Sequence, residues 1–393
     1  MNIRKIITFI FLSVIIALIA GLAACERVPQ ITQPTTPQMP EPSEEISIGV
    51  ILPLTGRLAD SFGEPIQQGF ELAHAEINNT QPNVPKFKFI IEDDQSTLEG
   101  AVKAFNKLVH QDSVSIILGP ATSSQVEEVF PIVEENQVVA ISPTSAARGL
   151  SAISDFAFRV ALATDVLTPS GIDITHAKLG YQRAATLYDE IDDFSIDADT
   201  AVQEELAAKE IEVVITETFQ GGDTDFTEQL TRIQELNPDV IFVSSLPPEK
   251  VGILTQAHQL GISAPFILRT LTAGDVQAAD AAAEGAMTFV GWGAAVDTPG
   301  NQAFVENYNA KFGMEPSNYA ARSYATLHIL AEAIANAQST DATSIRDALA
   351  NIKDLDTILG TFSFNADGDA VYDAKILIVK DGELVVFESS TAE

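Results

Sequence analysis

The sequence predicts an α/β protein made of two doubly wound, Rossmann-like units, each a mostly parallel sheet covered by helices. Short apolar runs alternate with amphipathic stretches from residue 46 onward, and such alternation is typical of βαβ units. The pattern restarts after about residue 165 without repeating the sequence. The roughly 350 residues beyond position 45 also exceed what one hydrophobic core usually supports, so two domains are expected.

In the first unit, strands are predicted at short apolar runs and helices where apolar residues recur at helical spacing. The run at 46–52 is bounded by Pro53 and suits a buried strand. Apolar residues from Ile66 to Ile77 then share one helical stripe. The alternation continues with a strand at 86–93, a helix at 97–111, a strand at 114–119, a helix from Ser123 and a strand at 138–142.

The second unit follows the same pattern after a helical stretch. Its predicted strands lie at 183–189, 212–219, 239–245 and 265–270, with helices at 197–210, 224–237 and 249–261 between them. A strand near 286–290 precedes helices at 301–312, 317–337 and 342–352. The chain closes with alternating strands, separated by turn residues at 365–369 and 381–382.

The N-terminus predicts export. Arg4 and Lys5 precede an apolar run at 6–22 that ends in small residues, as in a secretory signal. The run is short for a membrane span, although an uncleaved anchor is an alternative. Cys25, the only cysteine, follows Leu-Ala-Ala and resembles the lipidated cysteine of a bacterial lipoprotein lipobox. A small buried hydrophobe is the other interpretation of a lone cysteine.

The resemblance to a lipobox implies that residues 1–24 are a lipoprotein signal peptide and that Cys25 carries the lipid. Residues 25–45 are rich in proline and poor in apolar bulk, so we expect a disordered linker. The protein is then extracytoplasmic and lipid-anchored to the cell membrane, on its periplasmic face or at the cell surface.

Composition excludes several functions. The formal charge is −33, from 22 basic and 55 acidic residues, which makes nucleic acid an improbable partner. The same charge favours solubility, and we expect a monomer. One cysteine permits neither an intrachain disulfide nor a cysteine-based zinc site. The sequence contains no G-x-S-x-G, H-E-x-x-H, Walker or G-x-G-x-x-G motif, so neither enzymatic activity nor a cofactor or metal is expected.

Four blocks of the sequence resemble the extracytoplasmic solute receptors of ABC transporters, in the leucine/isoleucine/valine-binding branch. The likeness spans 46–388 and is most specific at 119–146. The blocks read IGVILPLTGRLADSFGEPIQQGFELAHAEIN, EDDQSTLEGAVKAFNKLV, GPATSSQVEEVFPIVEENQVVAISPTSA and GTFSFNADGD. The resemblance implies a type I periplasmic binding protein fold, in which three crossover strands join two lobes around a ligand cleft.

The family pattern assigns residues 46–163 to lobe 1, with 290–360 returning to it. Residues 164–289 form lobe 2, with about 361–390 returning. The implied function is to bind a small amino acid, or a related amide or carboxylate, and deliver it to an ABC permease. A sensory receptor of the same fold that acts on a signalling partner is one alternative. An extracytoplasmic hydrolase is another.

In lobe 1, ligand-binding residues are expected beyond the carboxyl ends of the strands. The small residues of GPATSS, at 119–124, let a ligand approach a helix N-terminus that can hold an anion. Ser123 could instead be only the helix N-cap. By resemblance, Ser123 binds the ligand carboxylate. The further candidates are Thr122, Ser142, Thr144, Ser145 and Ala146, where turn chemistry is the alternative, and Phe62, which either covers the ligand or packs in the core.

Lobe 2 departs from the family pattern. The acid that binds the ligand amine is expected just after PFIL, where this sequence has Arg269 and then Thr270. A buried ammonium without a carboxylate is costly. Either Asp189 or Glu190 serves the amine, or the ligand has none. Arg269 can grip a second carboxylate or be a structural surface residue.

Two further features have open interpretations. Acidic residues from Asp193 to Glu204 mimic the spacing of a calcium loop, but Ala198 stands where such a loop needs glycine. The segment also suits the acidic start of a helix, and no metal site is predicted. Trp292, close to the second crossover, is a candidate cleft aromatic or a packing residue of the core or hinge.

Overall fold

The computed structural model describes residues 45–81 and 84–387, so the predicted signal peptide, Cys25 and almost all of the predicted linker lie outside the described residues. The lobe 1 sheet is parallel throughout, in the order β2-β1-β3-β4-β5. Its strands are β1 (Glu45–Leu52), β2 (Lys86–Asp93), β3 (Ile116–Leu118), β4 (Val139–Ser142) and β5 (Ala157–Arg159). This order reverses direction between β1 and β3, which is where doubly wound sheets bind ligands.

Helices from both ends of the chain pack with this sheet. The N-terminal set is η1 (Ala59–Gly63), α2 (Glu64–Thr80), α3 (Leu98–His110), α4 (Ser123–Val133) and η2 (Ser151–Ile153). The C-terminal set is α10 (Asn301–Phe312), α11 (Asn318–Ala337) and α12 (Ala342–Ala350). One buried apolar cluster contains residues from the strands and from both sets, so the two parts of the chain share a single core.

Lobe 2 contains the second doubly wound sheet, in the order β15-β14-β10-β9-β8-β6-β7. The strands β6 to β10 are parallel, and β14 and β15 add an antiparallel edge. They are β6 (Arg183–Asp189), β7 (Glu212–Phe219), β8 (Val240–Ser244), β9 (Phe266–Arg269), β10 (Met287–Val290), β14 (Lys375–Lys380) and β15 (Glu383–Val386). The predicted pair of doubly wound sheets is confirmed.

The helices of lobe 2 are α5 (Thr164–Leu179), α6 (Asp193–Ala208), α7 (Thr227–Leu236), α8 (Pro247–Leu260), α9 (Ala273–Ala279) and η3 (Asp280–Ala283). Helix α6 starts four residues earlier than predicted, because Asp192 caps it by accepting a hydrogen bond from the Ser195 N–H at 2.9 Å. The acidic segment from Asp193 is therefore the first turn of a helix and not a loop. In the described part of the chain, no cluster of three His, Cys, Asp or Glu side chains suited to a metal is found.

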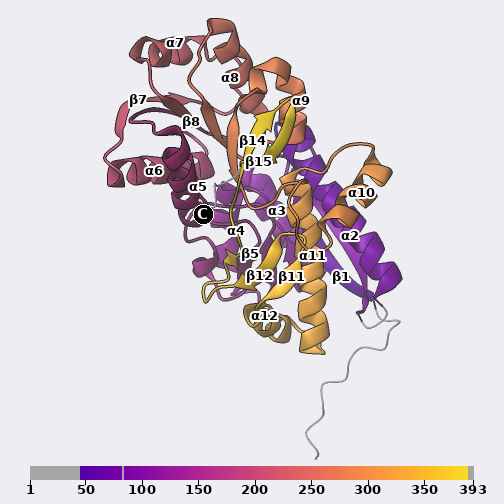
Figure 1. Ribbon diagram of the computed structural model, residues 1–393. Helices are drawn as coiled ribbons and strands as arrows, with labels where there is room; N and C mark the ends of the chain where they lie inside the picture. The colour runs from indigo at the N-terminus through magenta and orange to yellow at the C-terminus, as the bar shows by residue number, and fades with distance from the viewer. Residues whose placement is uncertain (1–44, 82–83, 388–393) are drawn as a thin grey trace, which may run out of the picture. The chain divides into compact units, whose positions relative to one another are not determined.

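The chain passes between the lobes three times, after β5, after β10 and after β13 (Ala370–Val371). The last return differs from the expected boundary near residue 361. Phe362 and Phe364, in β12 (Gly360–Phe364), are fully buried in the lobe 1 cluster, and β12 pairs with β11 (Leu355–Thr357). Figure 1 shows β11 and β12 beside α11, apart from the yellow strands β14 and β15 of lobe 2. The return to lobe 2 therefore begins about ten residues later than expected, because aromatic burial holds this hairpin in lobe 1.

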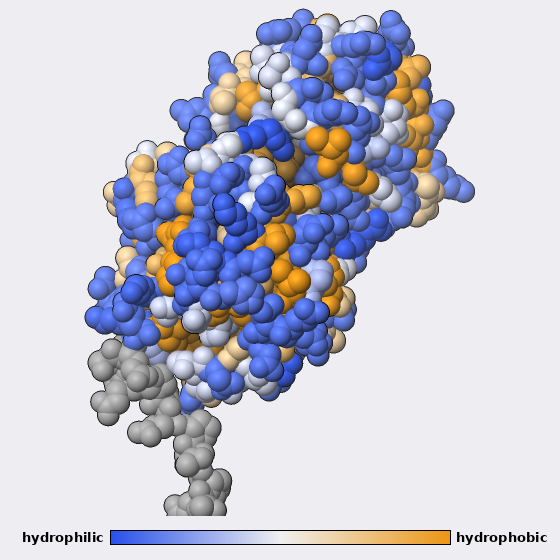
Figure 2. All heavy atoms as spheres, turned by 180° about the vertical axis from the view of Figure 1, so that it is seen from behind, coloured by the Kyte–Doolittle hydropathy of each residue, from blue (hydrophilic) through white to orange (hydrophobic). Residues whose placement is uncertain are grey.

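On the face drawn in Figure 2, hydrophilic residues predominate and apolar residues form separate patches. Within residues 45–81 and 84–387, no helix combines the length and apolarity that a membrane crossing requires.

Candidate functional site

A narrow cavity lies between the lobes. Its lining comes from both sheets, at the carboxyl ends of β3, β4, β8, β9 and β10, and from α11. Open α/β sheets bind ligands at this edge. No Asp or Glu is among the described residues that line the cavity.

One side of the cavity consists of small and hydroxyl residues of lobe 1, which we term the hydroxyl face. Its members are Ala121, Thr122, Ser123, Thr144, Ser145 and Ala146. Thr122 is the N-cap of α4, because its hydroxyl accepts a hydrogen bond from the Gln125 N–H. The first N–H groups of a helix have no intrahelical partner. Those of Ser123 and Ser124 are thus available to an anion, with the positive end of the helix dipole behind them.

Ser123 connects the start of α4 to the turn after β4. Its Oγ accepts hydrogen bonds from the N–H groups of Ala146 and Ala147, both at 3.2 Å, which leaves its hydroxyl proton free to donate. The Thr144 hydroxyl donates to the Ala121 carbonyl at 2.6 Å. The Ser145 hydroxyl is buried and has no partner among the described residues, so it can donate to a ligand.

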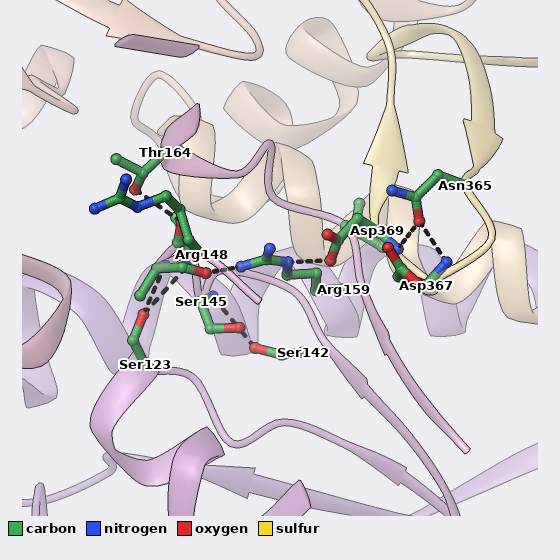
Figure 3. Close-up of polar contacts among 12 residues, drawn as sticks. Ser123, Ser142, Ser145, Arg148, Arg159, Thr164, Asn365, Asp367 and Asp369 are labelled. Atoms are coloured by element: carbon green, nitrogen blue, oxygen red, sulfur yellow. Dashed lines mark hydrogen bonds and ion pairs between the residues drawn. The ribbon is translucent and has the colours of Figure 1, made fainter. Parts of the chain in front are cut away.

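The turn after β4 is held from behind by a buried arginine. Arg159 is fully buried, donates to the Ala147 carbonyl and pairs with Asp369 at 2.5 Å. The Ala146 carbonyl accepts from the Thr164 hydroxyl at 2.8 Å. Figure 3 shows these contacts in sequence, from Ser123 through the turn to Arg159 and Asp369. The hydroxyl face is therefore fixed before any ligand arrives.

The other polar side, which we term the arginine face, consists of Arg269, Thr270 and Arg322. Arg269 ends β9 of lobe 2, and Arg322 lies on α11, which belongs to the lobe 1 core. Both are buried, with exposed fractions of 3% and 4%. Arg269 donates one hydrogen bond, to the Thr168 hydroxyl at 3.0 Å, and Arg322 donates none to any described residue.

The two guanidinium groups lie against aromatic rings rather than carboxylates. The Arg269 guanidinium carbon is 5.4 Å from the Phe194 ring centre, and that of Arg322 is 5.3 Å from the Tyr319 ring centre. Cation–π contacts compensate only part of the cost of burying a charge. Burial lowers the pKa of Arg269 to about 10 and also lowers the pKa of Arg322.

Lys250 on α8 supports the arginine face from behind. Its side chain is fully buried and its ammonium donates to the Thr270 carbonyl at 2.5 Å. Thr270 has a φ of +60°, a conformation that is strained for a β-branched residue and is often found at functional sites. Burial lowers the pKa of Lys250 to about 8.

The remaining walls of the cavity are apolar. They are Phe62, Leu167, Phe194, Leu246, Val290 and Tyr319. Phe62 packs edge-to-face on Tyr319, with ring centres 4.7 Å apart, and it projects from the single π-helical turn η1. A Cβ at Gly63 would lie 1.9 Å from the Pro53 carbonyl oxygen, so only glycine permits this turn beneath Phe62.

Ion pairs join the lobes outside the cavity. Arg57 of lobe 1 pairs with Glu249 on α8 at 2.7 Å. Arg148 of lobe 1 pairs with Asp197 and Glu204 on α6, at 2.6 and 2.8 Å. These contacts across the cleft show that the lobes are closed on the cavity.

Most of the predicted site residues are brought together: Phe62, Thr122, Ser123, Thr144, Ser145, Ala146, Arg269 and Thr270 all line the cavity. Ser142 is buried beside it, where its hydroxyl donates to the Pro120 carbonyl at 2.7 Å. Asp189 does not line it. That carboxylate accepts hydrogen bonds from the Ile191 and Gly221 N–H groups, and burial raises its pKa.

Two other residues of the sequence analysis also lie elsewhere. Glu190 is exposed and accepts a hydrogen bond from the Gln220 amide at 3.1 Å. Trp292 is in the lobe 1 core near the second crossing, where its Nε1 donates to Asn301 at 2.6 Å and its ring packs on Phe304. Trp292 is therefore a packing residue in this structure.

Sequence reasoning missed Arg322 and Tyr319, which lie three residues apart on α11. A signal was present: Arg322 is the one Arg or Lys of α11, whose other residues are mainly Ala, Ser, Thr, Tyr and aliphatic, most of them buried. A lone cation on such a helix is rarely buried without a partner or a function.

The comparisons with known proteins agree with this architecture. A family model described as periplasmic binding protein matches residues 45–383. The Leu/Ile/Val-binding protein BraC3 of Rhizobium johnstonii is 26% identical over 83% of this chain and 89% of its own length. The branched-chain amino acid transporter substrate-binding protein LivJ of Streptococcus pneumoniae, solved with isoleucine, is 28% identical, with a TM-score of 0.80 over 87% of this chain and 98% of that one.

A more distant structure shares the fold. The ABC transporter solute-binding protein of R. palustris, in complex with benzoate, is 21% identical, with a TM-score of 0.81 over 87% of this chain and 95% of that one. The fold is thus the type I periplasmic binding protein fold that the sequence predicted. Because the family model covers most of its length, the chain belongs to the periplasmic binding protein family.

Proposed function

We propose that the protein is the extracytoplasmic solute receptor of an ABC importer, which encloses a small organic carboxylate between its lobes and delivers it to a membrane permease. The observation that carries this proposal is the cavity at the carboxyl ends of both sheets, with free N–H groups at the start of α4 that suit an anion. Contacts to a ligand from both lobes favour the closed state, as in hinge closure generally.

The cavity lining also bears on the class of ligand. The names of the relatives favour a branched-chain amino acid. An α-ammonium, however, would have two buried guanidinium groups as neighbours and no acidic side chain in the described lining. Placing a third positive charge there is unfavourable. A carboxylate without a free ammonium therefore fits this lining better.

Two further parts of the proposal rest on the family and the sequence. The relatives are binding proteins, and we infer that this chain likewise performs no covalent chemistry. We also infer that Cys25 carries the lipid that holds the receptor near its permease, with the proline-rich segment as spacer. In a Cys25→Ser variant, the protein is expected to leave the membrane fraction. Retention there at the mature size would contradict lipidation.

The receptor function is tested on the full-length mature protein in detergent, against amino acids, monocarboxylates and dicarboxylates. At least one compound should raise Tm, because a ligand at 100 times its Kd adds about 2.7 kcal/mol to the free energy of unfolding. The same compound should reduce the radius of gyration in small-angle scattering and should be recovered unchanged. Binding without compaction, or turnover of the compound, would contradict the proposal.

A further inference from the structure

On the basis of the proposed function, we infer that the ligand carries two negatively charged groups, one held at the hydroxyl face and the other between Arg269 and Arg322. The chemical class is a dicarboxylate, or an equivalent pair of oxyanions, without a free ammonium. The inference rests on hydrogen bonding, charge and the origin of the two arginines.

The two guanidinium groups have few hydrogen-bond partners. Each carries five N–H donors, yet Arg269 uses one and Arg322 none within the described residues. Both side chains are more than nine-tenths buried, and both line the cavity. Neither forms an ion pair with a described acidic residue. Buried cations of this kind need an anion, and planar guanidinium groups match carboxylates in bidentate geometry.

The buried charges around the arginine face do not balance. Lys250, Arg269 and Arg322 bring three buried positive charges to this region. The buried carboxylate of Asp275 acts electrostatically on Lys250 and supplies one negative charge. Two other carboxylates act on these cations but already have partners. Glu249 is paired with Arg57, and Asp197, which acts electrostatically on Arg269, is paired with Arg148. Three positive charges and one negative charge leave two positive charges, which a dianion neutralises and a zwitterion does not.

The cavity offers two groups of anion-binding donors, one on each face. The hydroxyl face presents the free N–H groups at the start of α4 and the unpartnered Ser145 hydroxyl, which together suit one carboxylate. The arginines come from other elements, β9 and α11. An anion that occupied only the hydroxyl face would leave the guanidinium donors unused.

The origin of the arginines also explains how charge selects the ligand. Arg269 belongs to lobe 2 and Arg322 to the lobe 1 core, so closing the lobes brings two like charges into one cavity of low dielectric. A second anionic group between them removes this repulsion. A ligand shifts the equilibrium only by its difference in affinity for the two states, so a dianion favours closure more than a monoanion of the same shape.

The inference is tested by isothermal titration calorimetry of the full-length protein with matched ligands. The probes are succinate, glutarate and terephthalate, each compared with its monoamide, which has the same shape and one charge less, and with leucine and isoleucine. We expect at least one dicarboxylate to bind about 100-fold more tightly than its monoamide, because two or more charge-assisted hydrogen bonds depend on the second carboxylate. Equal binding of acid and monoamide would overturn the inference.

The outcomes separate this inference from the proposed function. Tight binding of leucine or isoleucine with no dicarboxylate binding would overturn the dianion while leaving the receptor function intact. Binding of no compound would overturn both. In an Arg322→Met variant, the affinities for the acid and its monoamide should converge, whereas Arg322→Lys should keep part of the preference.

Two further variants keep the test decisive if Arg322→Met does not fold. If Arg322→Met does not fold, Arg269→Met removes the corresponding charge from the other lobe and should give the same convergence. Arg183→Met is the matched control, because Arg183 is a partly exposed arginine of lobe 2 that is not part of the cavity lining. If Arg269→Met and Arg322→Met both kept the wild-type ratio of affinities for the dicarboxylate and its monoamide, the role of the arginine face would be refuted.

Discussion

On the hydroxyl face, the oxygens of Ser123 and Thr144 already make hydrogen bonds to the protein, and the turn behind them is held by Arg159. On the arginine face, Arg269 and Arg322 are equally buried but nearly without partners among the described residues. The oxygens of Ser123 and Thr144 are thus already paired without ligand, whereas both guanidinium groups of the arginine face lack most of their partners.

Because of this difference, we expect the two faces to have different roles in ligand binding. The side chains and loops of a preorganised face lose little conformational entropy when a ligand binds, and they fix the position of the first carboxylate. A face of unpaired buried charge penalises every ligand that leaves it unpaired, so it decides which ligands are rejected. We therefore expect substitutions on the hydroxyl face to affect folding and binding together, and substitutions on the arginine face to affect them in opposite directions.

The largest effect is expected from removing both charges of the arginine face. In the double variant Arg269→Met, Arg322→Met, dicarboxylate affinity should fall by about 3–5 kcal/mol, the usual cost of breaking a buried pair. The ligand-free protein should become more stable, by about 1–4 kcal/mol, because buried charge is replaced by apolar side chains. Calorimetry and urea unfolding measure the two quantities. A loss of stability along with the loss of binding would remove the distinction between the faces.

The next effect is a dependence on pH that only the arginine face should show. Burial lowers the pKa of Lys250 from 10.5 to about 8, so between these values the unfolded chain binds a proton that the native protein does not. The unfolding free energy of the wild type, minus that of Lys250→Met, should therefore rise as pH increases from 8 to 10.5. The full change is on the order of 3 kcal/mol.

The matched variant for this measurement is Ser145→Ala on the hydroxyl face, which removes a group that does not titrate in this range. Its difference from the wild type should stay constant between pH 8 and 10.5. Denaturant titrations at fixed ionic strength measure both differences. If the difference in unfolding free energy between the wild type and Lys250→Met did not change with pH, the ammonium beside Thr270 would not be destabilised by its surroundings.

The smallest effect is expected on the hydroxyl face. Ser123→Ala leaves the N–H groups of Ala146 and Ala147 without their acceptor, and we expect a loss of about 1–3 kcal/mol in stability, with or without ligand. Ligand binding should weaken modestly, because backbone N–H groups at the start of α4 remain. Ser124→Ala is the neighbouring control. If Ser123→Ala weakened binding strongly and left stability unchanged, the face would not be preorganised.

Sequence patterns predicted the strands and helices well because burial imposes period two or 3.6 on each element separately. The resemblance to a family predicted the hydroxyl face, since its residues lie close together in the chain, in 119–146. The arginine face was predicted only in part. Arg269 follows a recognisable strand, whereas Arg322 reaches the cavity because α11 folds back into lobe 1, a contact that no local pattern encodes.

Asp189 illustrates the same limit. Its position after β6 made it a reasonable candidate for a ligand amine, and the strand was predicted correctly. The Gly221 and Ile191 N–H groups both donate to its Oδ1, and one of them comes from a segment 32 residues away. Hydrogen bonds between distant loops determine whether a carboxylate faces a cavity, and they are not readable from spacing.

The central claim is that this receptor selects a ligand with two negative charges and no ammonium. Native mass spectrometry tests it most directly, on protein purified from its own cells under conditions that keep the bound ligand in place. The protein is then unfolded, and the compound that it releases is identified. We predict a copurified small molecule with two acidic groups that does not react with amine reagents. Leucine, isoleucine or valine as the released compound would contradict the account.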